Sequence, residues 1–446
     1  QLTSDFIAQI TQLIAKKDGN ALRELLQDIH FADIAELIEE LKSDQAIYLV
    51  KQLESDLTSE ALMELDDDVR EKILERLSPK EIAAELQELD TDDAADIIAE
   101  LDETTQQKVI DKIEDQERAA DIVELLNYDE DTAGALMAKE LVQVKETWTV
   151  AGCVREMRRQ AENVTRVHSI YVTNKEGKLT GRLSLKDLLT AEAKTKISDV
   201  FIPKVDYVTV HTENEEVARI MRKYDLEAIP VVDQQGILVG RITIDDIVDF
   251  IKDEAEKDYQ MAAGISQDVE ADDSILDLTK ARLPWLVLGL IGGLGSVYIM
   301  RGYDEALATH VELFFFTPLI AAMAGNVGVQ SSAIIVQGLA NDNVKGSLFK
   351  RLLKEVGLAL INGLALGLLV VLFGVLSSMD QKVAFTIAIS MLLVIIVAAL
   401  IGTFVPIILD KKGIDPAIAT GPFITTSNDI FGIFLFFFIA KMILNF

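Results

Sequence analysis

Hydrophobic and polar positions follow different patterns on the two sides of residue 282. After Arg282, apolar residues form five runs long enough to cross a bilayer, which takes about 18 or more such residues. The runs are Leu283–Met300, Val311–Leu339, Leu352–Leu376, Val383–Leu409 and Pro416–Leu444. Before Arg282, apolar residues instead recur at helical or alternating spacing among charged ones. The pattern predicts a five-helix transmembrane domain over 281–446, preceded by a large polar region.

Residues 1–137 carry helical spacing and no strand pattern. A short phrase of small, apolar and acidic residues recurs at Ala32–Leu37, Ile82–Leu86, Ala94–Ile98 and Ala119–Val123. Short amphipathic helices at a loose repeat are typical of a superhelical stack. We therefore expect an acidic, α-helical, superhelical N-terminal domain. Residues 1–20 are amphipathic and polar rather than uniformly apolar, so we expect no signal peptide there.

The next hundred residues repeat one order of elements twice. In the first copy, strands are predicted at Leu141–Val144, Ser169–Thr173 and Leu179–Leu183, with a helix at Val150–Gln160. The second copy repeats this order, with a strand at Ala228–Val232. We place the two copies at 138–200 and 201–245 and expect a tandem pair of small α/β domains.

The final helix of the second copy continues into an acidic segment, 246–280. Asp246, Asp249 and Asp253 fall on one side of this helix, where like charges repel. In the N-terminal domain, Asp93 and Asp96 belong to a similarly dense acidic run. Most such carboxylates form a solvated face, but carboxylates stacked this closely also suit a bridging cation. The segment is interpreted as a long acidic connecting helix with a linker.

The charge distribution narrows the function. Nine basic and nine acidic residues follow Arg282, so the whole net charge of −31 lies in the first 282 residues. An acidic surface repels nucleic-acid phosphates and argues against that partner. Cys153 is the single cysteine and the four histidines are scattered, which excludes an intramolecular disulfide and a zinc motif. With no phosphate-binding loop and no visible nucleophile–base pair, an ATPase pump is not expected, nor is an enzyme.

The basic residues predict the orientation of the spans in the bilayer. Cytoplasmic loops carry an excess of lysine and arginine. Basic residues cluster in the second and fourth loops, at Lys345, Lys350, Arg351, Lys354, Lys411 and Lys412. With five spans, the acidic region is then cytoplasmic and the C-terminus lies outside.

Asp429 lies near the middle of the last predicted span. An ionisable group there costs roughly 2–4 kcal/mol, so it indicates function by default. Oxygen-bearing side chains surround it in the run Thr425–Asp429, which includes Thr426. A single carboxylate with hydroxyls, amides and carbonyls suits a largely hydrated Mg²⁺ and does not suit zinc or copper. The structural alternative is a carboxyl group neutralised by protonation or by a hydrogen bond.

Two other features of the apolar half fit a cation path. The second span contains helix breakers and amides, from Pro318 to Asn326 and Gln330, and its glycines permit close helix approach or exposed carbonyls. Ordinary packing of small residues is the alternative reading. Asp415 precedes the last span on the predicted cytoplasmic side, where it is a candidate for the inner mouth.

The two α/β copies resemble a tandem pair of CBS domains. The phrase Gly240–Asp246, Gly-x-x-Thr-x-x-Asp, is similar to the nucleotide-facing turn of that family. The resemblance implies that Thr243 lies near a phosphate and Asp246 near ribose hydroxyls. ATP or another adenine nucleotide is thus a candidate ligand, while a dimerising scaffold that binds no ligand is the other reading.

The whole chain resembles the MgtE family of magnesium channels. The resemblance rests on Pro318–Gln330, on Asp415-Pro-Ala followed by Asp429, and on the order of helical domain, CBS pair, acidic helix and five spans. It implies a homodimer in a bacterial cell membrane, with one central pore flanked by Asp429 and lined by Asn326 and Gln330. It also implies regulatory Mg²⁺ sites. Together with the acidic runs above, the candidate regulatory residues are Asp225, Asp246, Asp249, Asp253, Asp258, Asp93 and Asp96.

These observations predict a Mg²⁺-selective channel that mediates passive magnesium uptake. Cytoplasmic Mg²⁺ is expected to bridge the acidic domains and to close the pore through the connecting, or plug, helix. A proton-coupled transporter for divalent cations, with Asp429 as the proton carrier, is the alternative. A membrane sensor that reads nucleotides is a third class, but it leaves Asp429 unexplained. The proton-coupled alternative would carry Mg²⁺ or Co²⁺.

Overall fold

A computed structural model describes residues 2–161, 164, 167, 169–266, 269, 273–340, 344 and 347–445. The chain divides into two compact units, Gln1–Ile251 and Lys252–Phe446. Lys345, one of the basic residues in the predicted orientation, lies outside the described residues. The units are taken in turn below, and helix α14 (Ile244–Ala263) crosses the division between them.

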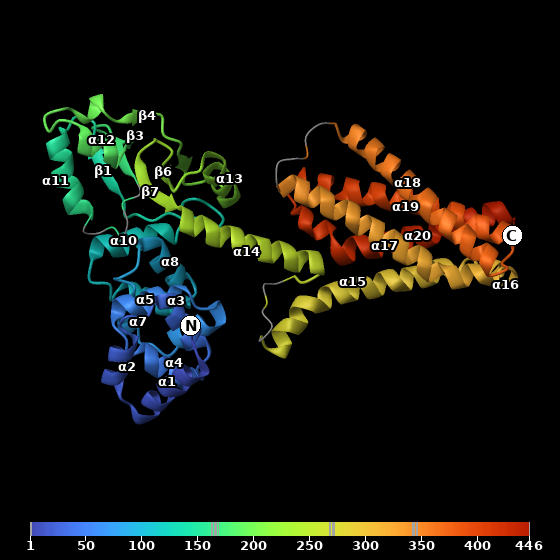
Figure 1. Cartoon of the computed structure of the whole chain (residues 1–446), viewed down its shortest axis with the longest axis horizontal. Helices are drawn as coiled ribbons and strands as arrows, with labels where there is room; N and C mark the ends of the chain where they lie inside the picture. The colour runs from blue at the N-terminus through green and yellow to red at the C-terminus, as the bar shows by residue number, and fades with distance from the viewer. Residues whose placement is uncertain are drawn as a thin grey trace. The chain divides into compact units, whose positions relative to one another are not determined.

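Ten short helices build the N-terminal part of the first unit (Figure 1). They are α1 (Ser4–Lys16), α2 (Gly19–Leu26), α3 (Phe31–Glu39), α4 (Ser43–Val50), α5 (Ser55–Met63), α6 (Asp67–Leu74), α7 (Pro79–Glu85), α8 (Thr91–Ala99), α9 (Glu103–Ile110) and α10 (Gln116–Leu125). Packing runs in series, because α3 contacts α5, α5 contacts α7, and α7 contacts α9. The repeated phrases supply the buried face: Ile34, Ile82, Ile97 and Ile122 are all buried in one core. The predicted helical domain is confirmed.

Local sequence fixes where these short helices begin. Ser78 and Glu81 form a reciprocal capping box around Pro79, the first residue of α7. The carboxylate of Asp102 accepts hydrogen bonds from the backbone of Thr104 and Thr105 at the start of α9. Asp18 and Asp115 cap α2 and α10 in the same way, so part of the acidic composition of this domain serves to begin helices.

Two small sheets follow, one for each predicted α/β copy. The first has the order β1 (Val142–Lys145), β2 (Ile170–Thr173), β3 (Leu179–Leu183), β4 (Ile202–Pro203). The second has the order β5 (Val208–Thr209), β6 (Ala228–Val232), β7 (Leu238–Thr243). In each, the first pair is parallel and the second antiparallel. The helices of the two copies are α11 (Val150–Gln160), α12 (Leu185–Thr190) and α13 (Asn214–Tyr224), with a 3-10 helix η2 (Ile197–Asp199).

Five helices of the second unit are long and apolar enough to span a bilayer. They are α15 (Ile275–Arg301), α17 (Val311–Ala340), α18 (Leu348–Leu376), α19 (Gln381–Asp410) and the last span, Pro416–Leu444, which consists of η3 (Pro416–Ala419) and α20 (Gly421–Leu444). A short helix, α16 (Asp304–Thr309), follows α15. Helix α17 packs on both α19 and α20, and α15 packs on α20, as the long helices of Figure 1 show. The five predicted spans are confirmed.

The structure differs from the predicted spans in two places. Helix α15 begins at Ile275, eight residues before the predicted first span, because Ser274 caps it and Asp277 pairs with Lys280 in its first turns. The last span is broken between Ala419 and Gly421, where a 3-10 turn ends at Thr420 and the helix restarts before Pro422. Proline lacks the amide hydrogen that a continuous helix requires, so the break follows from Pro416 and Pro422.

Candidate cation sites

The Asp429 carboxylate lies on α20 beside Gly325 of α17. A Cβ atom at Gly325 would be 3.4 Å from Oδ1 of Asp429, an ordinary contact, and 3.1 Å from Cγ2 of Thr425, a tight one. Oδ1 of Asp429 is buried and has no hydrogen-bond partner among the described residues. A buried oxygen without a donor carries a large desolvation cost unless a cation or a proton compensates it. This side chain therefore fits a cation ligand.

The other predicted pore residues are distributed unevenly around Asp429. Asn326 and Gln330 are exposed and lie one turn apart on one face of α17. Thr426 directs its methyl group toward Gly292 of α15, where a Cβ would collide with it. Asp415 accepts a hydrogen bond of 2.7 Å from the amide of Ala417 and so caps η3. The structure thus gives Asp415 a local structural role, separate from any role at a pore mouth.

Further polar groups lie inside the helix bundle. Asn428 of α20 is buried against Gly328 of α17. On α17, the Ser331 hydroxyl donates to Oε2 of Glu355 on α18 at 3.4 Å. Sequence reasoning noted Asn428 only as a neighbour of Asp429 and did not single out Glu355. Glu355 falls inside the predicted third span, and a carboxylate within a span was the signal that could have identified it.

A second group of carboxylates gathers where the helical domain meets the second CBS-like domain. Asp92, Asp93 and Asp96 of α8 lie close enough to Asp246, at the start of α14, for their charges to interact. Burial, with the charges of Asp246 and Asp96, raises the pKa of Asp93 to about 8. Burial also raises the pKa of Asp96 to about 7 and that of Asp92 well above its usual range. The ionised forms of these three carboxyl groups are therefore destabilised unless a cation lies beside them.

Hydrogen bonds fix Asp246 at this point. Its Oδ2 accepts from the amide of Thr243 at 2.9 Å and from the Thr243 hydroxyl at 2.6 Å, which caps α14. The opposing Asp92 is buried, and its Oδ1 has no hydrogen-bond partner in the described part of the chain. An orphaned carboxylate oxygen among other acids fits a cation. Still, within the described ranges no three carboxylate, imidazole or thiol side chains converge closely enough to ligate one ion by themselves.

The remaining predicted regulatory residues lie outside this group. Asp225 is exposed and ends α13 in a left-handed conformation. Asp249 and Asp253 are exposed on α14, and Asp258 is half-buried in the part of α14 that belongs to the second unit. Sequence spacing placed Asp249 and Asp253 with Asp246, and Asp246 is among the charges that act on Asp92, Asp93 and Asp96.

Ion pairs join the helical domain to the start of the first CBS-like domain, at Glu140, and to the second, at Arg241. Nη1 of Arg118 lies 3.0 Å from Oε1 of Glu140, and Nη2 of Arg241 lies 3.0 Å from Oδ2 of Asp90. The Thr91 hydroxyl donates to Glu140 at 2.7 Å. Because Arg241 lies on β7 and Asp246 follows it on α14, this network fixes both sides of the acidic group.

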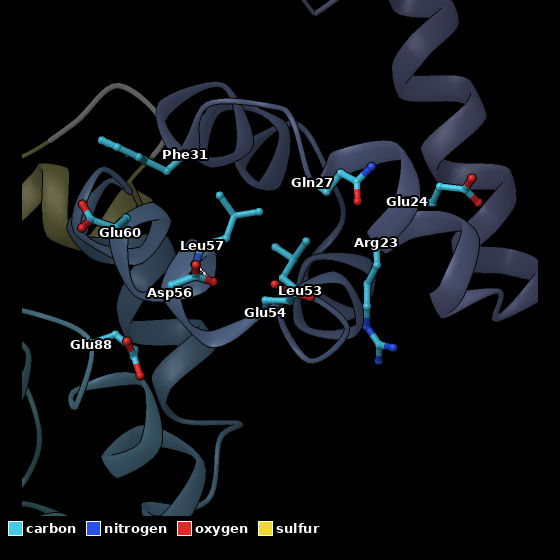
Figure 2. Close-up of a pocket in the computed structure, with 10 residues that line it drawn as sticks. All are labelled: Arg23, Glu24, Gln27, Phe31, Leu53, Glu54, Asp56, Leu57, Glu60 and Glu88. Carbon is cyan, nitrogen blue, oxygen red and sulfur yellow. Dashed lines mark hydrogen bonds between the residues drawn. The ribbon is translucent and has the colours of Figure 1, made fainter.

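The helical domain also contains a cavity of about 490 Å³. Its apolar lining comes from Phe31, Leu53 and Leu57, and its rim carries Arg23 with five carboxylates. Glu24, Glu60 and Glu88 point in different directions (Figure 2). The cavity therefore presents no converging set of ligands, and it contains none of the predicted site residues.

Five candidate membrane helices, the last of them carrying Asp429, joined to a helical domain and a CBS-like pair, are features of a multi-pass membrane transporter. Family comparison agrees: residues 317–439 match the divalent cation transporter MgtE, 29–131 the MgtE intracellular N domain, and 133–194 and 197–253 CBS domains. This chain belongs to the MgtE family of magnesium transporters. That family is one of transporters and not of enzymes.

Individual relatives support this assignment. The magnesium transporter MgtE of Bacillus subtilis is 35% identical over 322 residues, which is 72% of this chain and 71% of that one. The MgtE of Thermus thermophilus is 35% identical over 324 residues, 72% of each chain. An inosine-5'-monophosphate dehydrogenase of Halalkalibacterium halodurans is 30% identical over 40% of this chain, and the similarity covers only the CBS region.

Two solved structures resemble the cytosolic part. The cytosolic domain of the Mg²⁺ channel MgtE in complex with ATP aligns with a TM-score of 0.52 and 36% identity, covering 55% of this chain and 99% of that one. The soluble part of a magnesium transporter aligns with a TM-score of 0.51 and 30% identity, covering 56% and 98%. The helical domain and CBS pair thus share the fold of MgtE cytosolic domains.

Proposed function

We propose that this protein is a Mg²⁺-selective channel for passive magnesium uptake and that cytoplasmic Mg²⁺ closes it. The observation that carries the proposal is the half-buried Asp429 carboxylate beside Gly325, whose buried Oδ1 lacks a donor within the described residues. Mg²⁺ binds through one or two carboxylates and keeps several of its waters. Asp429 would supply the charge, and the exposed amides of Asn326 and Gln330 on α17 would contact the hydrated ion.

The oligomeric part of the proposal is a homodimer around one pore. Asn326 and Gln330 lie on a face of α17 that no part of the described chain covers. Two such faces around a twofold axis would line a polar path, with one Asp429 contributed by each subunit. We further propose that the acidic region is cytoplasmic and the C-terminus external, as the basic loops predict.

Closure is proposed to act through the acidic group at the start of α14. Mg²⁺ bound among Asp92, Asp93, Asp96 and Asp246 would relieve their mutual repulsion and hold α8 against α14. Shifting a two-state equilibrium from 1:99 to 99:1 takes about 5.5 kcal/mol of differential binding, which several bridging ions can share. We propose that Asp225, Asp249, Asp253 and Asp258 bind additional regulatory ions.

A nucleotide is a proposed second ligand of the CBS pair. A relative's cytosolic domain was solved in complex with ATP. In this chain the Thr243 hydroxyl donates to Asp246, in the turn that resembles the nucleotide-facing turn of CBS domains. Thr243→Ala should then weaken ATP binding measured by calorimetry on the full protein, and unchanged affinity would place the nucleotide elsewhere.

The decisive test of the channel is Asp429→Asn, recorded in planar bilayers or patches. The substitution keeps the shape and removes the charge, so Mg²⁺ current should be lost. Asp410→Asn, at the exposed end of α19, is the matched control and should conduct normally. Wild-type currents through Asp429→Asn would remove that residue from the pore. Flux that depends on a proton gradient and carries no channel current would favour the proton-coupled alternative.

A further inference from the structure

Asn428 is a buried amide with no hydrogen-bond partner in the described part of the chain. Its side chain is 1% exposed, and neither Nδ2 nor Oδ1 reaches a donor or acceptor there. A buried amide left unpaired costs about 1–3 kcal/mol, whereas an apolar side chain of the same shape costs nothing of this kind. Packing alone therefore does not explain an asparagine at this position.

Three helices converge on this amide. A Cβ atom at Gly328 of α17 would collide with Nδ2 of Asn428 and would lie 2.8 Å from Cγ2 of Ile424. In turn, a Cβ at Gly402 of α19 would collide with the carbonyl oxygen of Gly328 and lie 3.1 Å from Cβ of Ser331. The two glycines bring the backbones of α17 and α19 to the level of Asn428.

A second orphaned group lies on α19. Thr403, the residue after Gly402, is fully buried, and its hydroxyl also lacks a partner within the described residues. Buried hydroxyls in helices usually donate to the carbonyl four residues earlier, as Thr317 and Thr386 do here. Asn428 and Thr403 are thus unsatisfied polar side chains on two helices that pack together. Buried polar groups of this kind are the setting in which proteins hold internal water, each molecule making about three hydrogen bonds.

We propose that Asn428 binds internal water between α17, α19 and α20, and that this water supports the hydration shell of the cation at Asp429. This inference rests on the proposed pore role of the neighbouring Asp429. Asn428 then acts as a positioning residue, because it reaches the ion through water and not directly. Mg²⁺ keeps its waters more firmly than Ca²⁺, which takes more ligands in looser geometry. An ordered water site beside the ion thus favours Mg²⁺ over Ca²⁺.

The test is the Ca²⁺-to-Mg²⁺ permeability ratio of the full channel carrying Asn428→Leu, a substitution that fills the same space without polar atoms. Mg²⁺ flux should fall about twofold to tenfold, the range for losing one hydrogen bond between uncharged groups, and the ratio should shift toward Ca²⁺. Asn428→Ser, which retains a water-binding hydroxyl, should recover part of the selectivity. Asn362→Leu, the same change at an exposed site on α18, should change neither quantity.

A purely structural asparagine gives a different result. Asn428→Leu would then be at least as stable as the wild type, and its permeability ratio would be unchanged, which would overturn the inference. If Asn428→Leu does not fold, Asn428→Ala is judged by the same ratio. Asp429→Asn separates the two claims. Loss of current there with a normal ratio in Asn428→Leu refutes only this inference, whereas wild-type current there refutes the proposed pore itself.

Discussion

The backbone of Gly421 lies directly against the carbonyl oxygen of Ala262, so closely that a Cβ atom on residue 421 would collide with it. Gly421 has a φ of +52° and begins α20, while Ala262 belongs to the last turn of α14. Gly264, with a φ of +80°, packs on the ring of Pro422 at the same junction. The C-terminal end of α14 therefore packs on the N-terminal end of α20, the helix that carries Asp429.

A side chain at residue 421 should weaken this contact between α14 and α20. Gly421→Ala adds the collision with Ala262 to the cost of a left-handed conformation, which is roughly 1–2 kcal/mol for a residue with a Cβ. Because this contact joins α14 to α20, we expect the Gly421→Ala channel to close only at a higher cytoplasmic Mg²⁺ concentration. The measurement is open probability against internal Mg²⁺ in excised patches.

Gly413→Ala is the matched control for this experiment. Gly413 also has a positive φ, +68°, but a Cβ there meets nothing within 4 Å. It therefore carries the backbone strain without the collision. If both variants shift the closing concentration equally, the contact between Gly421 and Ala262 does not couple α14 to the pore.

Neutralising Asp246 should impair closure without unwinding α14. An asparagine at this position retains an oxygen that accepts from Thr243, so the cap survives while one charge of the acidic group is lost. We expect Asp246→Asn to raise the Mg²⁺ concentration needed for closure at least about tenfold, the factor for 1.4 kcal/mol. Asp245→Asn, its exposed neighbour, should leave closure unchanged. Equal curves for the two variants would place the sensor elsewhere.

The acidic group also predicts how stability depends on pH. The folded state holds protons on Asp93 and Asp96, whose pKa values are about 8 and about 7, that the unfolded chain releases near pH 4. Stability without divalent cations should therefore fall as pH rises from about 4 to about 8 and level off above that. Thermal unfolding of the cytosolic region, followed by circular dichroism of the whole protein at a series of pH values, measures this slope.

Two additions sharpen the pH experiment. Millimolar Mg²⁺ should flatten the slope, because a bound cation replaces the protons. Asp93→Asn removes a group that burial and neighbouring charges penalise, so it should raise stability at pH 8 by at least about 1 kcal/mol, on the scale of 1.36 kcal/mol per pKa unit. A slope that Asp93→Asn leaves unaltered would mean that this carboxylate is already ionised in the folded protein.

Sequence periodicity was sufficient to predict the helices and strands, but it was insufficient to predict which residues meet at the candidate cation sites. Long apolar runs and a repeated strand–helix order report burial along one element, so the spans and the CBS pair were predictable. The meeting of Asp93 with Asp246 depends on how α8 packs against a residue 153 positions later, which no local pattern encodes. Likewise, Asn428 is buried because Gly328 admits it, and the rotation of α20 that brings them together is set by packing.

The ion pair between Arg118 and Glu140 should contribute more stability than any surface pair of the cytosolic region. Both side chains are mostly buried, with 16% and 13% exposure, and Arg118 also donates to the carbonyl oxygens of Leu86 and Leu89. Arg118→Ala leaves Glu140 charged and buried, with Thr91 as its remaining hydrogen-bond donor, and such losses cost about 3–5 kcal/mol. Denaturant unfolding should show this loss, whereas Arg159→Ala, at a pair where the arginine is 73% exposed, should cost less than about 1 kcal/mol.

Since the same network holds Asp90 and Arg241 beside the acidic group, Arg118→Ala should also weaken closure by Mg²⁺. A destabilised variant that still closes at the wild-type Mg²⁺ concentration would separate the docking of the helical domain from regulation.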